Sequence, residues 1–420
     1  MTRKKSEATE SLLPVVPSVN CICCTYSAEE CSSRYDEFLT AIMPKKGVQG
    51  AFPKPEGRGY QRLIHVINWK MFEDLTQTPG APGFEGQVRK VMHAYLSRYT
   101  EEIVHDRLGS IFGVKTGDDQ GPKVMVAGHM DEVGFMVTKI TAEGFLKFQT
   151  LGGWWSQVLL AQRVDVITRQ GKRIPGVIGS IPPHLLNEDR RRKPVDLDQM
   201  FIDIGAKNEE QVIEWGIRPG DFAVPHCPFV EMEGGTRLMS KAWDNRFGCG
   251  IAIELLEGLQ RVPHPNIVYS GATVQEEVGL RGAGTAANLI NPDIFLAVDC
   301  GPAGDIPGVY DGFGRIGKGV LIRIYDRTMI TLPGMRDFLL DTAESENIPY
   351  QFFVSQGGTD AGRVHVIGNG IPSATIGICG RYIHSHATIV DKEDIEATKV
   401  FAVALVKRLD RSVVESILGW

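Results

Sequence analysis

The chain contains the stretch Val124-Met125-Val126-Ala127-Gly128-His129-Met130-Asp131-Glu132, in which an apolar run ends in a histidine and two carboxylates. Residues 124–127 have the length and composition of a buried strand. In open α/β sheets, functional groups gather outside the carboxyl ends of the strands. The stretch therefore predicts a buried strand that delivers His129 and Asp131 to a polar site at one edge of a sheet.

Four other short polar motifs stand where a buried strand would end. They are Trp243-Asp244-Asn245, Gln275-Glu276-Glu277, Val298-Asp299-Cys300 and Tyr382-Ile383-His384-Ser385. With His129 they supply two histidines and several carboxylates, which are the ligands that a pair of Zn²⁺ or Co²⁺ ions needs. Two such ions held about 3.5–4 Å apart form a hydrolytic centre. The five motifs together predict a two-metal site.

Each motif also has an ordinary structural interpretation. His129 alone could simply hydrogen-bond to backbone, whereas in the metal-binding interpretation Asp131 is the carboxylate that orients its second ring nitrogen. Asp244 precedes a helical pattern and could be its N-cap. Glu276 and Glu277 could be a surface acidic pair, but their flanks are not a charged run, and adjacent carboxylates repel without a cation. Because successive side chains at a strand end diverge, one glutamate can bind metal while the other stays free as a general base.

Two assignments near the C-terminus stay open at this point. His386 competes with His384 for the role of second imidazole, and spacing alone does not separate them. The glycine-rich loop 356–362 lacks the GK[ST] ending of a phosphate loop, which argues against nucleotide binding. Its residues Gly358, Thr359 and Asp360 are predicted to let a substrate approach the backbone closely.

Alternating strand and helix patterns in residues 71–134 and 236–420 predict an α/β domain with a mostly parallel sheet covered by helices. Helical stretches are expected at 71–77, 335–346 and 392–415. Residues 135–235 differ, because short alternating strands there are punctuated by glycine and proline. They predict a small β-rich domain inserted into the larger one. The Gly152-Gly153-Trp154-Trp155 stretch within it is predicted to serve packing or an interface.

Residues 1–70 lack sustained periodicity and predict an N-terminal extension that is disordered or not part of the native protein. The cluster Cys21, Cys23, Cys24 and Cys31 could be a metal knuckle, but its spacing matches no paired C-x₂-C pattern. In another interpretation, Met71 is the natural start.

The composition excludes several functional classes. The net charge of −6 provides no electrostatic footprint for nucleic acid or an anionic membrane. No apolar run approaches the length of a membrane span, and no secretory h-region follows the N-terminus. The remaining cysteines are scattered, mostly in apolar surroundings, which predicts reduced thiols in a cytoplasmic protein.

The motifs resemble those of the TET-type (tetrahedral) dinuclear metallo-aminopeptidases, which include glutamyl and deblocking aminopeptidases and some members labelled endoglucanase. The resemblance runs from about residue 71 to the C-terminus. It rests on Ala127-Gly128-His129-Met130-Asp131-Glu132-Val133-Gly134-Phe135, Lys241-Ala242-Trp243-Asp244-Asn245-Arg246, Thr273-Val274-Gln275-Glu276-Glu277-Val278-Gly279-Leu280-Arg281-Gly282-Ala283 and Arg381-Tyr382-Ile383-His384-Ser385.

The resemblance implies a role for each site residue. One metal would be held by His129, Asp244 and Asp299, and the other by Asp244, Glu277 and His384, so that Asp244 bridges the two. Glu276 would be the general base, and Asp131 would orient His129. The resemblance also implies that the inserted domain is a β-barrel used for dimerisation, and that dimers assemble into a hollow tetrahedral dodecamer.

We therefore expect an aminopeptidase that removes N-terminal residues from peptides with two divalent ions, Zn²⁺, Co²⁺ or Mn²⁺. The alternatives are another dinuclear metallohydrolase, such as a deacylase, and a non-catalytic, metal-stabilised peptide-binding assembly. A glycosidase normally uses two carboxylates without a metal, and the two histidines argue against it. A free glutamate beside a metal-binding one argues against a purely structural site. The preferred N-terminal residue, the native metal and the exact assembly stay open.

Overall fold

The structure is a computed structural model that describes residues 67–419. The predictions for residues 1–66, including the cysteine cluster at 21–31, lie outside the described residues.

The described helices and 3₁₀ turns (η) are α2 (Trp69–Gln77), α3 (Gly86–Leu96), η1 (Ser156–Val158), η2 (Pro183–Leu185), α4 (Glu188–Arg191), η3 (Leu197–Gln199), α5 (Glu209–Glu214), α6 (Trp243–Gly258), α7 (Arg281–Ile290), α8 (Pro333–Ser345), α9 (Asp360–Val364), α10 (Lys392–Arg408) and α11 (Arg411–Leu418). The strands are β1 (Ile103–His105), β2 (Ile111–Thr116), β3 (Lys123–His129), β4 (Gly134–Ile140), β5 (Leu146–Leu151), β6 (Arg163–Ile167), β7 (Arg173–Gly179), β8 (Phe201–Asp203), β9 (Phe222–Pro225), β10 (Val230–Glu231), β11 (Arg237–Ser240), β12 (Ile267–Thr273), β13 (Ile294–Pro302), β14 (Val320–Tyr325), β15 (Tyr350–Val354), β16 (Ser373–Gly380) and β17 (Thr388–Asp391).

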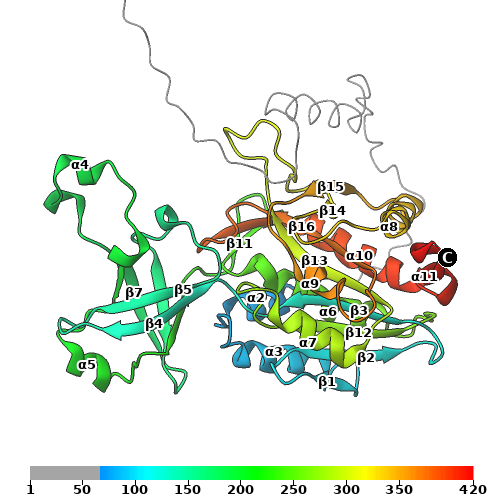
Figure 1. The fold of residues 1–420 in the computed structure, drawn as a ribbon, viewed down its shortest axis with the longest axis horizontal. Helices are drawn as coiled ribbons and strands as arrows, with labels where there is room; N and C mark the ends of the chain where they lie inside the picture. Colours follow the sequence, from blue (N-terminus) through cyan, green and yellow to red (C-terminus); the bar gives the residue numbers. More distant parts are fainter. Residues whose placement is uncertain (1–66, 420) are drawn as a thin grey trace, which may run out of the picture. The chain divides into compact units, whose positions relative to one another are not determined.

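An eight-stranded sheet in the order β1-β2-β12-β3-β13-β16-β14-β15 forms the centre of the larger domain (Figure 1). The adjacent strands β12, β3, β13 and β16 are parallel, which confirms the predicted α/β fold at the place where the site lies. Toward the edges the pairing changes, because β2 runs antiparallel to β12 and β14 antiparallel to β16. The carboxyl ends of the four central strands therefore open on one common edge.

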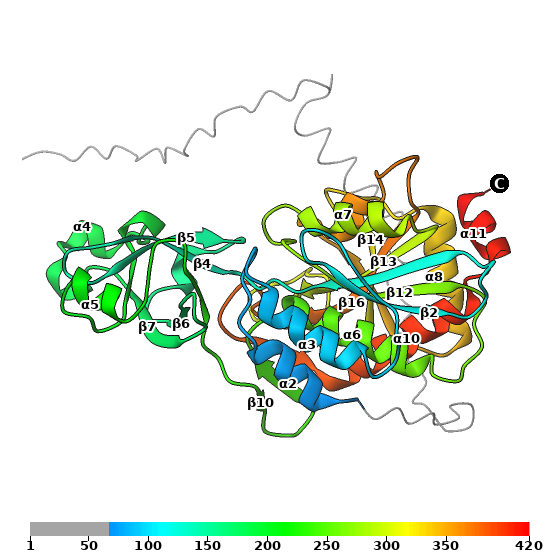
Figure 2. The same ribbon diagram turned by 90° about the horizontal axis from the view of Figure 1, so that it is seen from below.

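Helices cover both faces of this sheet, and the burial of β3 shows why. Val124 and Val126 belong to a core cluster with residues of α6 and α10, whereas Met125 and Ala127 belong to a second cluster with residues of α7 and α9. Alternate side chains of a strand point to opposite faces, so a strand buried on both sides is apolar without interruption. Figure 2 shows α7 on one side of the sheet and α3, α6 and α10 on the other.

The inserted part is a closed barrel in the order β4-β5-β8-β7-β6-β9, with a hydrophobic core of its own (Figure 1). Its strands run from Gly134 to Pro225, so they begin one residue before the β-rich segment expected at 135–235 and end ten residues short of its last residue. Past Pro225 the chain leaves the barrel, because β10 and β11 form a separate three-stranded sheet with β17. Among residues 67–419, no helix combines the length and the apolar character needed to cross a bilayer.

Capping residues explain where the helices differ from the predicted ranges. The expected helix at 71–77 begins earlier, at Trp69, because the Asn68 side chain accepts a hydrogen bond from the Met71 amide. The single helix expected at 392–415 is two helices. Asp410 accepts a hydrogen bond from the Val413 amide and starts α11 as a separate helix.

Candidate active site

The predicted motifs meet at the carboxyl ends of the four parallel strands. His129 is the last residue of β3 and pairs in register with Thr273, the last residue of β12. The Gln275–Glu277 segment follows β12, Asp299 lies in β13, and the loop that carries His384 follows β16. Residues up to 255 positions apart in sequence, such as His129 and His384, thus face one small volume.

Asp244 lies between the two histidines. Its Oδ1 is 3.3 Å from His129 Nε2 and its Oδ2 is 3.4 Å from His384 Nε2. The capping role that Asp244 might have had falls to Asn245, whose Oδ1 accepts from the Gly248 amide and whose Nδ2 donates to the Val298 carbonyl. The backbone at both positions is non-helical although α6 begins at Trp243. The Asp244 carboxylate is therefore free to face both imidazoles.

Backbone carbonyls orient both imidazoles in the same way. His129 Nδ1 is 3.1 Å from the Asp131 carbonyl oxygen, and His384 Nδ1 is 2.8 Å from the Gly153 carbonyl oxygen. An Nδ1–H group that donates to a carbonyl leaves a lone pair on Nε2 in the neutral ring. In both rings Nε2 faces carboxylate oxygens. Lone pairs that face carboxylates from several sides define a place for a cation.

Asp131 makes a second set of contacts besides those to His129, the residue that the motif resemblance implied it would orient. Its carboxylate is 3.6 Å from His129 Nδ1, and the shorter contact to this ring comes from its backbone carbonyl. The carboxylate also accepts hydrogen bonds from the amides of Glu276 and Glu277, each at 3.0 Å. Asp131 therefore holds the turn that carries both glutamates as well as the first imidazole.

The two glutamates diverge, as expected for neighbours at a strand end. Glu276 Oε2 lies 3.8 Å from His129 Nε2, whereas Glu277 Oε1 lies 3.4 Å from His384 Nε2. The Glu277 side chain is only 4% exposed and its Oε1 accepts no hydrogen bond, while the Glu276 side chain is 11% exposed. Glu276 is thus the more accessible of the pair.

The site holds more buried negative charge than its histidines balance. Burial, together with neighbouring carboxylates, raises the pKa of Glu276 well above its ordinary value and that of Glu277 to about 8. Burial also raises the pKa of Asp299, with Asp244 adding to the effect. The exception is Asp244, whose pKa stays below the usual range despite burial because both imidazoles, when protonated, donate to it and attract its charge. Divalent cations would stabilise all these carboxylates in their ionised form.

The donor set fits divalent metal ions. Ligand atoms of His129, Glu276 and Asp299 lie within 4.8 Å of one another, and so do those of His129, Asp244 and Glu277. Imidazole nitrogens with carboxylate oxygens suit Zn²⁺, Co²⁺ or Mn²⁺. The buried Oε1 of Glu277 supports the same conclusion, because it accepts no hydrogen bond although it faces His384 Nε2, and such an oxygen is costly to bury unless a cation binds it.

The remaining predicted residues lie around this centre. His386 makes no hydrogen bond or ion pair to the site carboxylates within residues 67–419, which distinguishes it from His384. Asp360 is buried beside the site and bonds through Oδ2 to the Thr273 hydroxyl. Thr359 is fully buried and its hydroxyl lies 2.8 Å from that of Thr375, so it fastens the loop to β16. Gly358 is half-buried and packs against Thr328.

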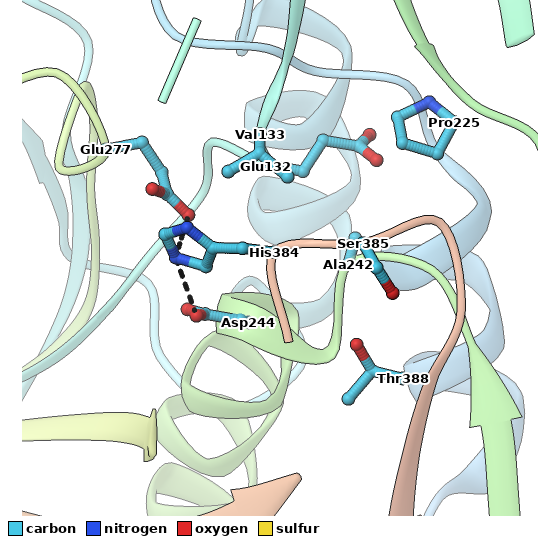
Figure 3. A pocket seen from close by; sticks show the side chains of 9 residues that line it. All are labelled: Glu132, Val133, Pro225, Ala242, Asp244, Glu277, His384, Ser385 and Thr388. Atoms are coloured by element: carbon cyan, nitrogen blue, oxygen red, sulfur yellow. Dashed lines mark ion pairs between the residues drawn. The ribbon is translucent and has the colours of Figure 1, made fainter. Parts of the chain in front are cut away.

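Sequence reasoning missed a contribution from the barrel. A pocket where the barrel meets the larger domain is drawn in Figure 3. Its lining residues are Glu132, Val133, Pro225, Ala242, Asp244, Glu277, His384, Ser385 and Thr388. The Gly152–Gly153 turn after β5 packs against two of these residues, Glu277 and His384. A Cβ on Gly152 would lie 3.2 Å from Glu277 Oε2, and one on Gly153 would lie 3.3 Å from His384 Nδ1. Trp154, by contrast, packs on Phe135 as predicted.

We expect Gly153→Ala to weaken metal binding by about 10- to 100-fold, the usual cost of disturbing a group that orients a metal ligand. The added methyl group would crowd the His384 ring, which is already bonded to the Gly153 carbonyl. Competition with a chelator measures the affinity. Gly86→Ala is the control, because a Cβ there meets nothing within 4 Å. An unchanged affinity in Gly153→Ala would show that the turn does not position His384.

Comparison of the chain with known proteins shows which family has this site. The family model for M42 glutamyl aminopeptidases matches residues 109–401. The chain belongs to the M42 glutamyl aminopeptidase family. A glutamyl aminopeptidase of Lactococcus lactis is 42% identical over 348 residues, which cover 82% of this chain and 98% of the relative. The family resemblance drawn from the motifs is thereby confirmed.

Solved structures agree with this M42 assignment. A TET aminopeptidase from a marine sediment archaeon of the Thaumarchaeota is similar at a TM-score of 0.81 and 43% identity, covering 83% of this chain and 99% of that one. The TET1 peptidase of Pyrococcus horikoshii, which can assemble into a tetrahedron or a large octahedral shell, is similar at 0.73 and 30%, covering 81% and 99%. As an M42 enzyme, this protein is a metal-dependent aminopeptidase, a hydrolase that acts on peptide N-termini.

Proposed function

We propose that the enzyme binds two divalent cations and hydrolyses the first peptide bond of its substrates with Glu276 as general base. His129, Asp244 and Asp299 would hold one ion, and Asp244, Glu277 and His384 the other. The observation that carries the proposal is Asp244, whose two oxygens each face one imidazole at 3.3 and 3.4 Å. A carboxylate in that position suits a bridge between two ions.

The metals, when bound, would lower the pKa of water and polarise the scissile carbonyl. The chain's own part is proton transfer. Glu276 would take a proton from the attacking water as the new C–O bond forms, and would return it to the amine nitrogen as the C–N bond breaks. The greater exposure of the Glu276 side chain supports this choice over Glu277. Asp131 contributes by holding the amides of both glutamates.

The proposed substrates carry an acidic residue at the N-terminus. The Lactococcus lactis relative is named for glutamyl substrates, and Arg323 of β14 gives this chain a suitable cation. Arg323 is 5% exposed, its Nε has no hydrogen-bond partner, and its charge lowers the pKa of Asp299 against the effect of burial. Its Nη1 donates to Asp326 Oδ2 at 3.3 Å and to the Gly357 carbonyl in the glycine-rich loop at 3.4 Å, which leaves Nε as the free donor. A buried guanidinium with a free donor beside the site can pair with a carboxylate.

A panel of aminoacyl-p-nitroanilides (Glu, Leu, Lys and Ala), assayed after chelation and re-addition of Zn²⁺ or Co²⁺, tests activity and preference together. We expect metal-dependent release that is fastest for Glu. Arg323→Gln should reduce kcat/KM for the Glu substrate by at least ~10-fold relative to the Leu substrate, because the substrate carboxylate loses its partner. An unchanged Glu-to-Leu ratio would reject Arg323 as the specificity residue. No release from any substrate would favour a deacylase.

We also propose that the enzyme acts as a homo-oligomer built from dimers, with the barrel as the dimerisation domain and a dodecamer as the full assembly. The shell formed by the Pyrococcus horikoshii relative supports this. The buried free thiols Cys227, Cys249, Cys300 and Cys379 support a reducing, cytoplasmic location. Light scattering on the purified protein would give the mass of the assembly, and a monomeric mass at micromolar concentration would reject the assembly.

A further inference from the structure

Three consecutive backbone amides at the site are held by two carboxylates from distant parts of the chain. The amides of Glu276 and Glu277 donate to Oδ1 and Oδ2 of Asp131. The preceding amide, that of Gln275, donates to Oε1 of Glu85 at 3.0 Å, across a sequence separation of 190 residues. Each amide of the turn thus has one carboxylate oxygen as its acceptor.

This turn needs such support because its backbone is strained. Gln275 has φ of +56°, in the left-handed region that residues with a Cβ rarely adopt. Strained conformations of this kind persist only where the surrounding structure holds them. The strain aims two successive glutamate side chains at different imidazoles, Glu276 at His129 and Glu277 at His384.

Glu85 is itself firmly placed. It precedes α3, is only 5% exposed, and its Oε1 also accepts a hydrogen bond from the Gly83 amide at 2.8 Å. Burial, with the nearby charge of Asp131 as a second cause, raises the pKa of Glu85 to about 7. A buried carboxylate beside an already acidic site is unfavourable in itself. The hydrogen bonds that Glu85 accepts from the amides of Gly83 and Gln275 offset part of that cost and tie the carboxylate to the Gln275–Glu277 turn.

We propose that Glu85 is a positioning residue that fixes the Gln275–Glu277 turn. In this role it would direct Glu277 toward the metal position that Glu277 shares with His384, and Glu276 toward the attacking water. The inference rests on the proposed function for the roles of the two glutamates. Glu85 acts through the backbone and touches neither metal nor substrate. No sequence motif indicates this role, because the contact joins the start of α3 to the loop after β12.

Hydrogen exchange on the metal-free protein tests the contact directly. Glu85→Ala should speed exchange of the 275–277 amides by about 10- to 100-fold, the factor expected from losing a hydrogen bond to a charged group. Glu85→Gln retains an oxygen acceptor and should restore most of the protection. Asp394→Ala is the matched control. Asp394 is also buried, accepts from the amides of Gly317 and Gly319 at 2.7 and 2.6 Å, and has a pKa raised to about 7 by burial.

In the metal-loaded protein, Glu85→Ala should bind Zn²⁺ at least ~10-fold more weakly and lose kcat with little change in KM. The proposal is overturned if the 275–277 amides still exchange slowly in Glu85→Ala. It is also overturned if they exchange as fast in Glu85→Gln as in Glu85→Ala, or if Asp394→Ala speeds their exchange to the same extent. Because exchange is measured without metal or substrate, it decides the positioning role even if the peptidase assays fail.

Discussion

Glu276→Gln should lower kcat by at least ~10²-fold while the enzyme keeps its metals, which is the usual scale of general-base catalysis. Glutamine has nearly the same shape and its backbone amide can still donate to Asp131, so the turn should persist. The amide side chain, however, cannot take a proton from water. Turnover of a Glu p-nitroanilide checks the loss of kcat, and the metal content of the same sample checks that the metals are retained.

Glu277→Gln is the matched control for this experiment. Glu277 occupies the next position on the same turn, but its buried Oε1 faces His384 Nε2. We expect this variant to lose metal as well as activity, because a neutral amide is a poor replacement for a carboxylate ligand. If Glu276→Gln has wild-type activity, or if it loses metal as Glu277→Gln does, Glu276 is not the general base.

The sequence predicts the centre of this site because its polar residues lie at or near the carboxyl ends of strands, with His129 ending β3 and Asp299 lying three residues before the end of β13. His129 and Asp299 belong to strands that are recognisable as apolar runs, and parallel strands bring their carboxyl ends together. The alternation of helix and strand predicts the α/β class for the same reason. Local patterns carry this information, since these central strands are buried on both faces and polar residues lie in or just after them.

The parts that escaped prediction depend on atoms and contacts that no local pattern encodes. The acceptor for His384 is a backbone carbonyl at Gly153, in a domain inserted far from it in sequence. The Glu85 contact to Gln275 is equally remote. Arg323 lies inside an otherwise apolar strand, where only the three-dimensional structure shows that its Nε lacks a partner. Spacing alone does not separate His384 from His386, so the sequence assigned the role to His384 only through the motif resemblance, and the loop conformation, in which His384 has φ of +54°, is not encoded in that spacing.

Asp244→Ala should remove both metals as well as activity, and has the largest expected effect on metal binding. Its oxygens face His129 and His384 at 3.3 and 3.4 Å, so each proposed metal position loses a ligand at once. Changing a group that only supports a ligand weakens metal binding by about 10- to 100-fold, and loss of a shared ligand should exceed that. Metal analysis after dialysis, with affinities from chelator competition, measures the change.

Two further variants separate loss of the bridge from loss of stability. Asp244→Asn keeps the shape of the side chain but removes its charge, and should lose metal nearly as completely as Asp244→Ala. Asp106→Ala removes a carboxylate that accepts from the amides of Gly109 and Ser110 outside the site, and should lower the melting temperature with both metals retained. Two metals per chain in Asp244→Ala would contradict a bridge. One retained metal would assign Asp244 to a single ion and would reject its role as a bridge.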